Sequence, residues 1–264
     1  MNNLEKALLI LETFLNREHE IGIIRLVELT GLNVSTIHRI VKVLVNGGYL
    51  IQPHARGKYS LGPKFLQYSN TVMDRFKIKD VAPAIMAKLN QKVNECVNLV
   101  VLDSNEALYV DCVEPAKSSY KLRIFTQVGA RVPLYCTAVG KILLAYMNER
   151  EQEEYFKTSE LIARTRNTIT DPIQLMREFS SIKRDGYSID DEETELGVRC
   201  IAAPVRDHAG DVVAAISVSG PSTRLTNPKI RELEPLLKAA ALEISRSIGY
   251  AADRNMKLES KAEY

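Results

Sequence analysis

The chain has 264 residues, of which 45% are hydrophobic and 26% charged, and its formal net charge is +2. This length allows two domains with adequate cores, while the near-neutral balance excludes a polycation, so nucleic-acid binding would need locally concentrated positive charge. Because the cysteines lack the paired spacing of a zinc site and no run of about eighteen apolar residues occurs, we expect a cytoplasmic protein with reduced cysteines, no metal or cofactor and no membrane contact.

The first predicted element is an amphipathic helix whose apolar stripe runs from Leu4 to Leu15. A second, short helix is expected over Ile24 to Thr30. The link Gly31-Leu32-Asn33 that follows has the length that a helix-turn-helix requires. We interpret the first helix as scaffold for the next two, with a contribution to a dimer contact as an alternative role.

The stretch from Gly31 to Leu50 has the pattern of a helix that reads a DNA groove. We expect a helix over Val34 to Asn46, capped by Asn33 and ended by Gly47-Gly48. An apolar stripe recurs at i, i+3, i+4 and i+7, at Ile37, Ile40, Val41 and Leu44. The opposite face carries cations and hydrogen-bonding groups but no acid: Ser35, Arg39, Lys42 and Asn46, with Thr36 and His38 on its flanks. Taken alone, such a helix is also compatible with a core helix that has a solvated side.

Two short strands are predicted next, Tyr49 to Gln52 and Lys58 to Gly62, around a basic, glycine-containing turn. Arg56 and Lys58 sit where the tip of a wing can approach phosphate or the minor groove, although a lone basic hairpin is usually a solvated loop. The order helix, helix, helix, hairpin favours the wing. Residues 1–70 hold eight basic and five acidic side chains, a balance of +3 that exceeds that of the whole chain.

Residues 63–69 are expected to close this winged domain. A helical connector is then predicted from Asn70 to about Gln91, interrupted near Pro83, because proline restarts a helix more readily than it continues one. We place the domain boundary at this connector.

The second half mixes strands and helices, which indicates an α/β sheet domain of the sensor type. Strands are predicted at Val97 to Leu102, Ala107 to Val113, Tyr120 to Phe125, Tyr187 to Asp190, Cys200 to Val205 and Val212 to Ser219. Helices are predicted at Lys141 to Met147, at Glu149 to Phe156, from Asp171-Pro172 to about Arg184, and after Asn227-Pro228. Residues 251–264 read as a frayed tail.

Polar groups from four segments of this half can converge at strand ends. The helix start at Ala138-Val139-Gly140 offers backbone N–H groups and a partial positive charge, where a small carboxylate can dock. Ser217 and Ser219 are two apart in a strand, so their hydroxyls share a face. Asp190 and Cys200 complete the candidate set. Each of these residues alone also has an ordinary structural explanation. Ser217 and Ser219 can be sheet residues whose hydroxyls are hydrogen-bonded within the protein, Cys200 can be a small core residue, and Asp190 can belong to a solvated turn.

An enzyme would have to use the same residues. Cys200 as a nucleophile needs a base, and the only histidine outside the N-terminal segment, His208, falls in a predicted hairpin turn at the far end of the strand from Cys200. The acidic run at residues 190–195 lacks the spacing and glycine of a calcium loop. Binding without turnover is favoured; the alternatives are a small-molecule enzyme using Cys200 and a winged-helix protein-interaction module.

Over nearly its whole length the chain resembles the IclR family of bacterial transcriptional regulators. The N-terminal match is the Gly31-to-Leu50 stretch followed by Tyr59-Ser60-Leu61-Gly62. The C-terminal match is more specific and consists of four blocks in family order, residues 133–141, 186–193, 197–204 and 214–221.

The resemblance implies an α+β protein with a winged helix-turn-helix DNA-binding domain at residues 1–69, a linker helix at 70–91 and a GAF-like effector-binding domain at 92–250. It implies a pocket made by Ala138, Val139, Asp190, Val198, Cys200, Ser217 and Ser219. It also places Ser35, Thr36, His38 and Arg39 at groove-reading positions. The expected ligand is a small carboxylate of the 2-oxo acid or sugar acid class, and Val139, where small residues are frequent, would narrow the site.

The sequence therefore predicts an effector-responsive transcription factor, a repressor, that binds double-stranded operator DNA of pseudo-palindromic sequence. The resemblance implies a homodimer formed through the DNA-binding half, or a dimer of dimers, the homotetramer. A ligand can change the DNA affinity only if it binds the DNA-competent conformation of the protein and its other conformations with different affinities.

Overall fold

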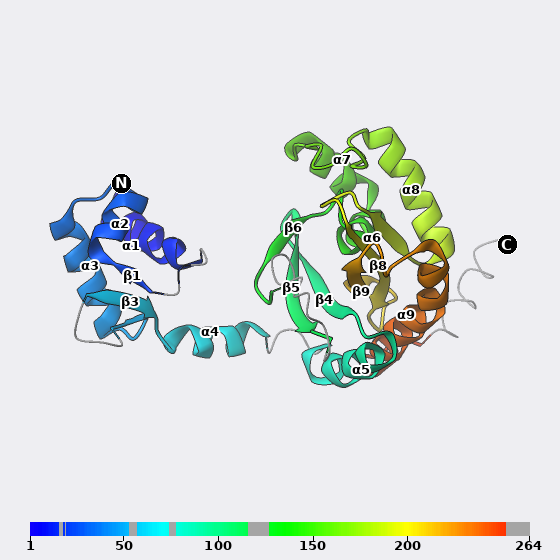
Figure 1. The fold of residues 1–264 in the computed structure, drawn as a ribbon, viewed down its shortest axis with the longest axis horizontal. Helices are drawn as coiled ribbons and strands as arrows, with labels where there is room; N and C mark the ends of the chain where they lie inside the picture. Colours follow the sequence, from blue (N-terminus) through cyan, green and yellow to red (C-terminus); the bar gives the residue numbers. More distant parts are fainter. Residues whose placement is uncertain (16–17, 19, 53–56, 74–77, 116–126, 252–264) are drawn as a thin grey trace. The chain divides into compact units, whose positions relative to one another are not determined.

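The computed structural model describes residues 1–15, 18, 20–52, 57–73, 78–115 and 127–251. The chain divides into two compact units, Met1–Phe76 and Lys77–Tyr264 (Figure 1). Each unit has its own cluster of buried hydrophobic residues. Within the described part, no helix is both long and apolar enough to cross a membrane.

The first unit is a small helical domain with a three-stranded antiparallel sheet of order β1-β3-β2. Its helices are α1 (Asn3–Glu12), α2 (Ile23–Thr30), α3 (Val34–Asn46) and α4 (Lys64–Met73), and a 3-10 turn at Thr13–Leu15 follows α1. Its strands are β1 (Ile21–Gly22), β2 (Leu50–Ile51) and β3 (Lys58–Leu61). This is the arrangement of a winged helix-turn-helix, as predicted.

Helix α3 has the predicted bounds, and local signals explain both of its ends. The Asn33 side chain accepts a hydrogen bond from the Thr36 N–H, which satisfies one orphan donor of the first turn. At the other end Gly47 is still right-handed, and Gly48 is the residue with positive φ, +75°. The four residues of the predicted apolar stripe are buried and pack in one cluster with residues of α1, α2 and β2, including Ile10, Leu26 and Leu50.

Three details of this unit differ from the sequence expectation. The wing strands are shorter than predicted, and the turn at residues 53–56, which includes Arg56, lies outside the described residues. The strand β1 was not predicted; its two residues pair with Tyr59 and Lys58 of β3, a contact that no local pattern signals. Helix α4 begins at Lys64, inside the segment expected to close the domain.

The second unit is built on a six-stranded antiparallel sheet of order β6-β5-β4-β9-β8-β7. The strands are β4 (Cys96–Asp103), β5 (Glu106–Val113), β6 (Arg131–Pro133), β7 (Ser188–Asp191), β8 (Val198–Arg206) and β9 (Val212–Pro221). Five of them correspond to predicted strands, and β6 was not predicted. The strand predicted at Tyr120 to Phe125 lies outside the described residues.

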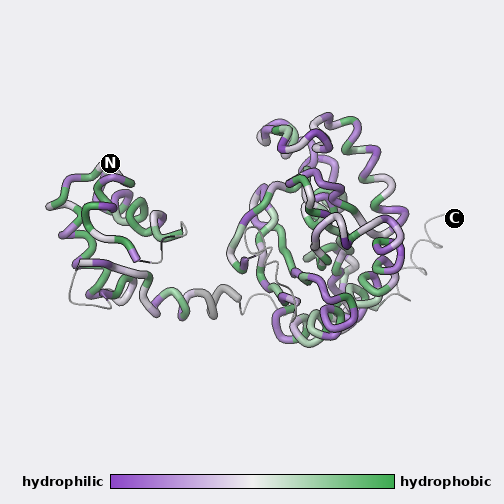
Figure 2. The backbone as a smooth tube through the Cα atoms, in the orientation of Figure 1, coloured by the Kyte–Doolittle hydropathy of each residue, from purple (hydrophilic) through white to green (hydrophobic). Residues whose placement is uncertain are grey.

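Helices cover both faces of this sheet. They are α5 (Ile78–Val93), α6 (Ala138–Tyr146), α7 (Glu149–Thr158), α8 (Pro172–Asp185) and α9 (Asn227–Ser247). Helices α5 and α9 pack together on one face, and α6, backed by α8, lies on the other (Figure 1). The central strands are largely hydrophobic while the covering helices alternate in hydropathy, which fits a sheet buried on both sides (Figure 2).

The predicted interruption of the connector helix was wrong. Helix α5 runs through Pro83 without interruption, because the loss of one backbone hydrogen bond is offset by packing of the buried neighbours Ala82, Ile85 and Met86. The last helix begins at Asn227, where the Asn227-Pro228 signal predicted its start; Thr226 is its N-cap residue, and the Asn227 side-chain oxygen accepts a hydrogen bond from Arg199. The predicted cap at Asp171, with Pro172 in the first helical turn, is confirmed.

Candidate functional site

A pocket lies between the start of α6 and the face of the sheet that α6 covers. It holds about 540 Å³ of empty space, counting the part open to solvent. It is lined by Tyr109, Val132, Thr137, Ala138, Val139, Asp190, Thr194, Glu195, Val198, Cys200, Ser217 and Ser219. All seven residues predicted for the effector site are in this lining, although they come from four separate segments.

The α6 end of the pocket presents unpaired backbone donors. The Thr137 hydroxyl accepts from the Gly140 N–H, and its carbonyl accepts from the Lys141 N–H. No described residue accepts a hydrogen bond from the Ala138 or Val139 N–H, which line the pocket. Two free amides at a helix N-terminus, together with its partial positive charge, suit one carboxylate.

Glycine at position 140 is required for this arrangement. A Cβ added there would lie 2.5 Å from Leu134 Cα and 2.5 Å from the Thr137 hydroxyl oxygen. The segment before α6 therefore crosses directly over the first turn of the helix. This crossing fixes the direction in which the two free amides point.

The sheet side of the pocket is a row of small polar side chains. Cys200 of β8 pairs with Asp190 of β7 on one side and with Ser219 of β9 on the other. Ser217 and Ser219 share the face that α6 covers, as expected from their spacing. The fully buried Asn98 of β4 holds both hydroxyls, since its Nδ2 lies 3.3 Å from Ser217 Oγ and 3.1 Å from Ser219 Oγ.

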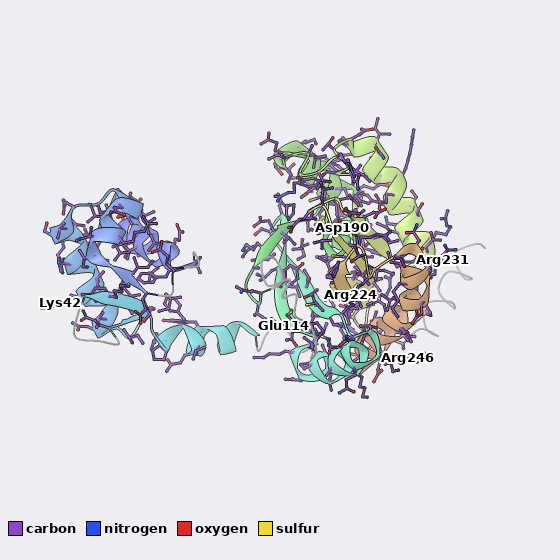
Figure 3. The ribbon with its side chains drawn as sticks, viewed as in Figure 1. Lys42, Glu114, Asp190, Arg224, Arg231 and Arg246 are labelled. Atoms are coloured by element: carbon purple, nitrogen blue, oxygen red, sulfur yellow. The ribbon has the colours of Figure 1, made fainter. Side chains whose placement is uncertain are left out.

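Asp190 organises the loop that closes one side of the pocket. Its Oδ1 accepts from the Glu193 N–H at 2.7 Å, and its Oδ2 accepts from the Thr194 hydroxyl at 2.8 Å. Burial raises the pKa of Asp190, while these donors favour the ionised form and oppose that rise. Asp190 is buried inside the second unit (Figure 3), and its hydrogen bonds hold the loop that forms this wall of the pocket.

Within the described part of the second unit, no histidine lies beside Cys200 to act as the base that a nucleophile needs. Burial raises the pKa of its thiol, so the thiolate is disfavoured. His208 is exposed in the turn between β8 and β9, whereas Cys200 lies near the start of β8, so the predicted separation of the two is confirmed. Among the described residues, no cluster of three or more His, Cys, Asp or Glu side chains could hold a metal ion.

Sequence reasoning missed six residues of this site. They are Tyr109, Val132, Thr137, Thr194, Glu195 and, behind the serines, Asn98. Thr137 carried a usable signal, because a threonine directly before a predicted helix is a favoured N-cap. Asn98 carried another, as a polar residue within an apolar strand. The remaining four depend on which face of each strand or loop turns toward α6.

The outer face of α3 forms the second candidate site, a shallow groove in the first unit. The groove is lined by His38, Arg39, Val41, Lys42, Val45, Asn46, Gln52 and Tyr59. His38, Arg39 and Lys42 are exposed, and the described lining contains two cations and no carboxylate. Lys42 is labelled on this unit in Figure 3. Positive charge and hydrogen-bonding groups along one helix face are what a DNA groove and its phosphates require.

The other predicted DNA-contact residues are distributed around this groove. Ser35 is exposed and donates to Asn33 Oδ1 at 2.9 Å, while Thr36 is half-buried at the capped turn. Arg39 donates to Asn3 Oδ1 of α1 at 3.1 Å, so α1 orients the guanidinium. Lys58 is exposed at the start of β3.

Comparison with known proteins gives consistent matches over both units. Residues 70–246 match the family model described as "Bacterial transcriptional regulator IclR C-terminal", and residues 3–54 match the IclR helix-turn-helix domain. The HTH-type transcriptional regulator KipR of Bacillus subtilis is 37% identical over 245 residues, which cover 93% of this chain and 96% of KipR.

Solved structures of IclR-type regulators match almost the whole chain, and two of them serve as examples. The crystal structure of the Thermotoga maritima IclR is 36% identical, with a TM-score of 0.81 and coverage of 95% of this chain and 100% of that one. An IclR homolog from Microbacterium hydrocarbonoxydans, crystallised in complex with 4-hydroxybenzoate, is 27% identical, with a TM-score of 0.81 and coverage of 94% and 99%.

Proposed function

The chain belongs to the IclR family of bacterial transcriptional regulators, and we propose that it is a repressor whose operator affinity changes when a small carboxylate occupies the pocket beside α6. Membership makes it a DNA-binding regulator with an effector-binding C-terminal domain, in a family of regulators rather than enzymes. The repressor role, the effector class and the contact residues are the parts that we propose.

The observation that carries the effector assignment is the pairing of two free amides with a row of hydroxyls. The Ala138 and Val139 N–H groups take a carboxylate, and Ser217 and Ser219 bond a neighbouring oxygen. No lysine or arginine is part of the described lining, so the helix end supplies the positive potential. The related protein crystallised with 4-hydroxybenzoate supports an acid as ligand.

The proposed DNA contacts are polar residues of α3 and of the wing, of which Arg56 lies outside the described residues. Ser35, Thr36, His38 and Arg39 face base edges in the major groove, and Lys42, Arg56 and Lys58 contact phosphate. We propose a homodimer or a dimer of dimers on a pseudo-palindromic operator, because a two-fold protein matches a two-fold site. Such an oligomer would repress transcription by occupying the promoter through its DNA-binding units.

The proposed coupling between the two units runs through the connector, residues 70–91. The effector acts by binding the DNA-competent and other arrangements with different affinity.

The experiment is a thermal-shift screen of small acids followed by DNA binding. Pyruvate, glyoxylate, 4-hydroxybenzoate and sugar acids are each added to the full chain, and a ligand at about 100 times its Kd should stabilise the native state by about 2.7 kcal/mol. Fluorescence anisotropy with fragments flanking the chain's own gene then measures operator affinity with and without each positive acid. An acid that binds but leaves operator affinity unchanged refutes the regulatory proposal. Stabilisation by none of the acids refutes the effector class.

A further inference from the structure

Two thiols meet on neighbouring strands, on the sheet face that carries the pocket serines. Cys96 begins β4 and Cys112 lies near the end of β5, and their sulfur atoms are 3.3 Å apart. Cys96 is 5% exposed, whereas Cys112 is half-buried. Both are present as thiols. A disulfide requires about 2.05 Å between the sulfurs, so rotation of the two side chains and a small approach of the strand ends would join them.

The thiol pair is connected to the pocket by hydrogen bonds. Cys96 Sγ lies 3.3 Å from Asn98 Oδ1, and as a thiol it donates to that oxygen. The other end of the same amide, Asn98 Nδ2, donates to Ser217 and Ser219. Loss of the Cys96 thiol proton therefore removes a bond that orients the amide on which both serine hydroxyls depend.

The pair is also connected to helix α5. Asn90 of α5 donates through Nδ2 to the carbonyls of Glu95 and Val113, which are the residues adjacent to Cys96 and Cys112. Figure 3 labels Glu114 where β5 ends, close to α5. One amide therefore spans the two strand ends that a disulfide would draw together, so a change at the thiols reaches α5 as well as the pocket.

We propose that Cys96 and Cys112 form a redox-reactive dithiol that a hydroperoxide converts into an intramolecular disulfide, and that this oxidation loosens the hold of Asn98 on the pocket serines. Cys112, the more exposed thiol, reacts first as its thiolate. Its sulfur attacks one peroxide oxygen, the O–O bond breaks, and the leaving hydroxide or alkoxide takes a proton, which leaves a sulfenic acid.

The second step closes the disulfide. Cys96 Sγ attacks the sulfenic sulfur, the S–O bond breaks, and the hydroxyl leaves as water with the Cys96 proton. The two thiols lose two electrons and the hydroperoxide gains two. A thiol reductant reverses the change by exchange.

The first test is chemical and uses the full chain treated with hydrogen peroxide. We expect the chain to lose two hydrogens, about two mass units, and to recover them with dithiothreitol. Cleavage after Glu106 separates the two cysteines, so linked peptides containing Cys96 and Cys112 identify the bond. Cys112→Ser and Cys96→Ser should each abolish the link, whereas Cys136→Ser, a matched buried cysteine, should keep it. Linkage between chains, linkage through Cys136 or Cys200, or no linkage in the wild type overturns the proposal.

The second test reads the pocket without any effector, so it does not depend on the function proposed above. Hydrogen exchange is measured by mass spectrometry in reduced and oxidised wild-type protein. Peptides spanning Ser217 to Ser219 should exchange at least about twofold faster after oxidation, because the Asn98 bonds to them are weakened. Peroxide-treated Cys112→Ser should not show this increase. Unchanged exchange in a wild-type sample that is fully disulfide-bonded refutes the connection to the pocket.

Discussion

Lys141 of α6 and Glu193, in the loop after β7, form a buried ion pair with 2.5 Å between Nζ and Oε1. The lysine side chain is 0% exposed, and Nζ also contacts Glu178 Oε1 of α8 at 2.7 Å. The second carboxylate oxygens of both glutamates are buried without a partner among the described residues. Since Lys141 follows the pocket amides by one helical turn and Glu193 bonds to Asp190, this cluster fixes two walls of the pocket relative to each other.

Lys141→Met should be strongly destabilising. The variant leaves two carboxylates facing each other in a buried site, and breaking one side of such a pair costs about 3–5 kcal/mol. The free energy of unfolding is measured by urea denaturation. The control is Lys238→Met, because Lys238 pairs with Glu234 at 2.7 Å on the partly exposed side of α9 and should contribute less than about 1 kcal/mol. A loss at Lys141 no larger than that at Lys238 would contradict the role given to the cluster.

Glu193→Gln should change how stability depends on pH. Burial is the largest influence on Glu193 and raises its pKa to about 7, although Lys141 favours the charged form. Between the ordinary glutamate pKa of about 4.3 and this value, the native state keeps a proton that the unfolded chain releases. Rising pH in that window therefore favours unfolding, by at most about 4 kcal/mol from this carboxyl.

The measurement for Glu193→Gln compares urea denaturation at pH 5 and pH 8. The wild type should lose more stability over this interval than the variant, because glutamine has no proton to release. Glu234→Gln on α9 serves as the control and should follow the wild type. Equal losses in all three proteins would show that Glu193 does not titrate in this range.

The features predicted best from the sequence are those set by the spacing of residues that are close together in the chain. The apolar stripe of α3 and its Asn33 cap lie within fourteen consecutive residues, so periodicity alone placed them correctly. The convergence of Ala138, Asp190, Cys200 and Ser217 was a hypothesis from the chemistry of these residues, and the family motifs joined them into one pocket and added Val198. No local spacing indicates that Ser217 and Ala138 are neighbours. The cluster around Lys141 escaped prediction for the same reason: Glu178 and Glu193 lie far along the chain, and only tertiary packing buries all three.

Arg39→Ala should weaken operator binding by about 1–3 kcal/mol if the guanidinium reads a base edge. Its hydrogen bond to Asn3 orients an exposed guanidinium beside the groove of α3. Fluorescence anisotropy at one fixed salt concentration measures the change. Arg25→Ala is the matched control, since Arg25 is an exposed arginine of the same unit that pairs with Glu18 and Glu28. Comparable losses in the two variants would indicate nonspecific electrostatics and remove Arg39 from the base-reading set.

Ser217→Ala should weaken effector binding by about 1 kcal/mol or more, while operator affinity without effector is preserved. The variant removes a hydroxyl that faces the pocket, and it leaves Asn98 Nδ2 with Ser219 as its remaining partner there, so the buried amide is not stranded. Calorimetry with whichever acid the thermal-shift screen identifies measures the loss. Ser247→Ala, at the exposed end of α9, is the control and should bind like the wild type.

The outcome for Ser217→Ala separates a direct contact from a structural one. If the hydroxyl bonds the ligand, affinity falls while the melting temperature of the ligand-free protein changes little, because Ser219 keeps the amide satisfied. If the hydroxyl only supports Asn98, the ligand-free protein loses stability and ligand affinity is retained. This second pattern would remove Ser217 from the binding site and leave the Ala138 and Val139 amides as the main recognition element.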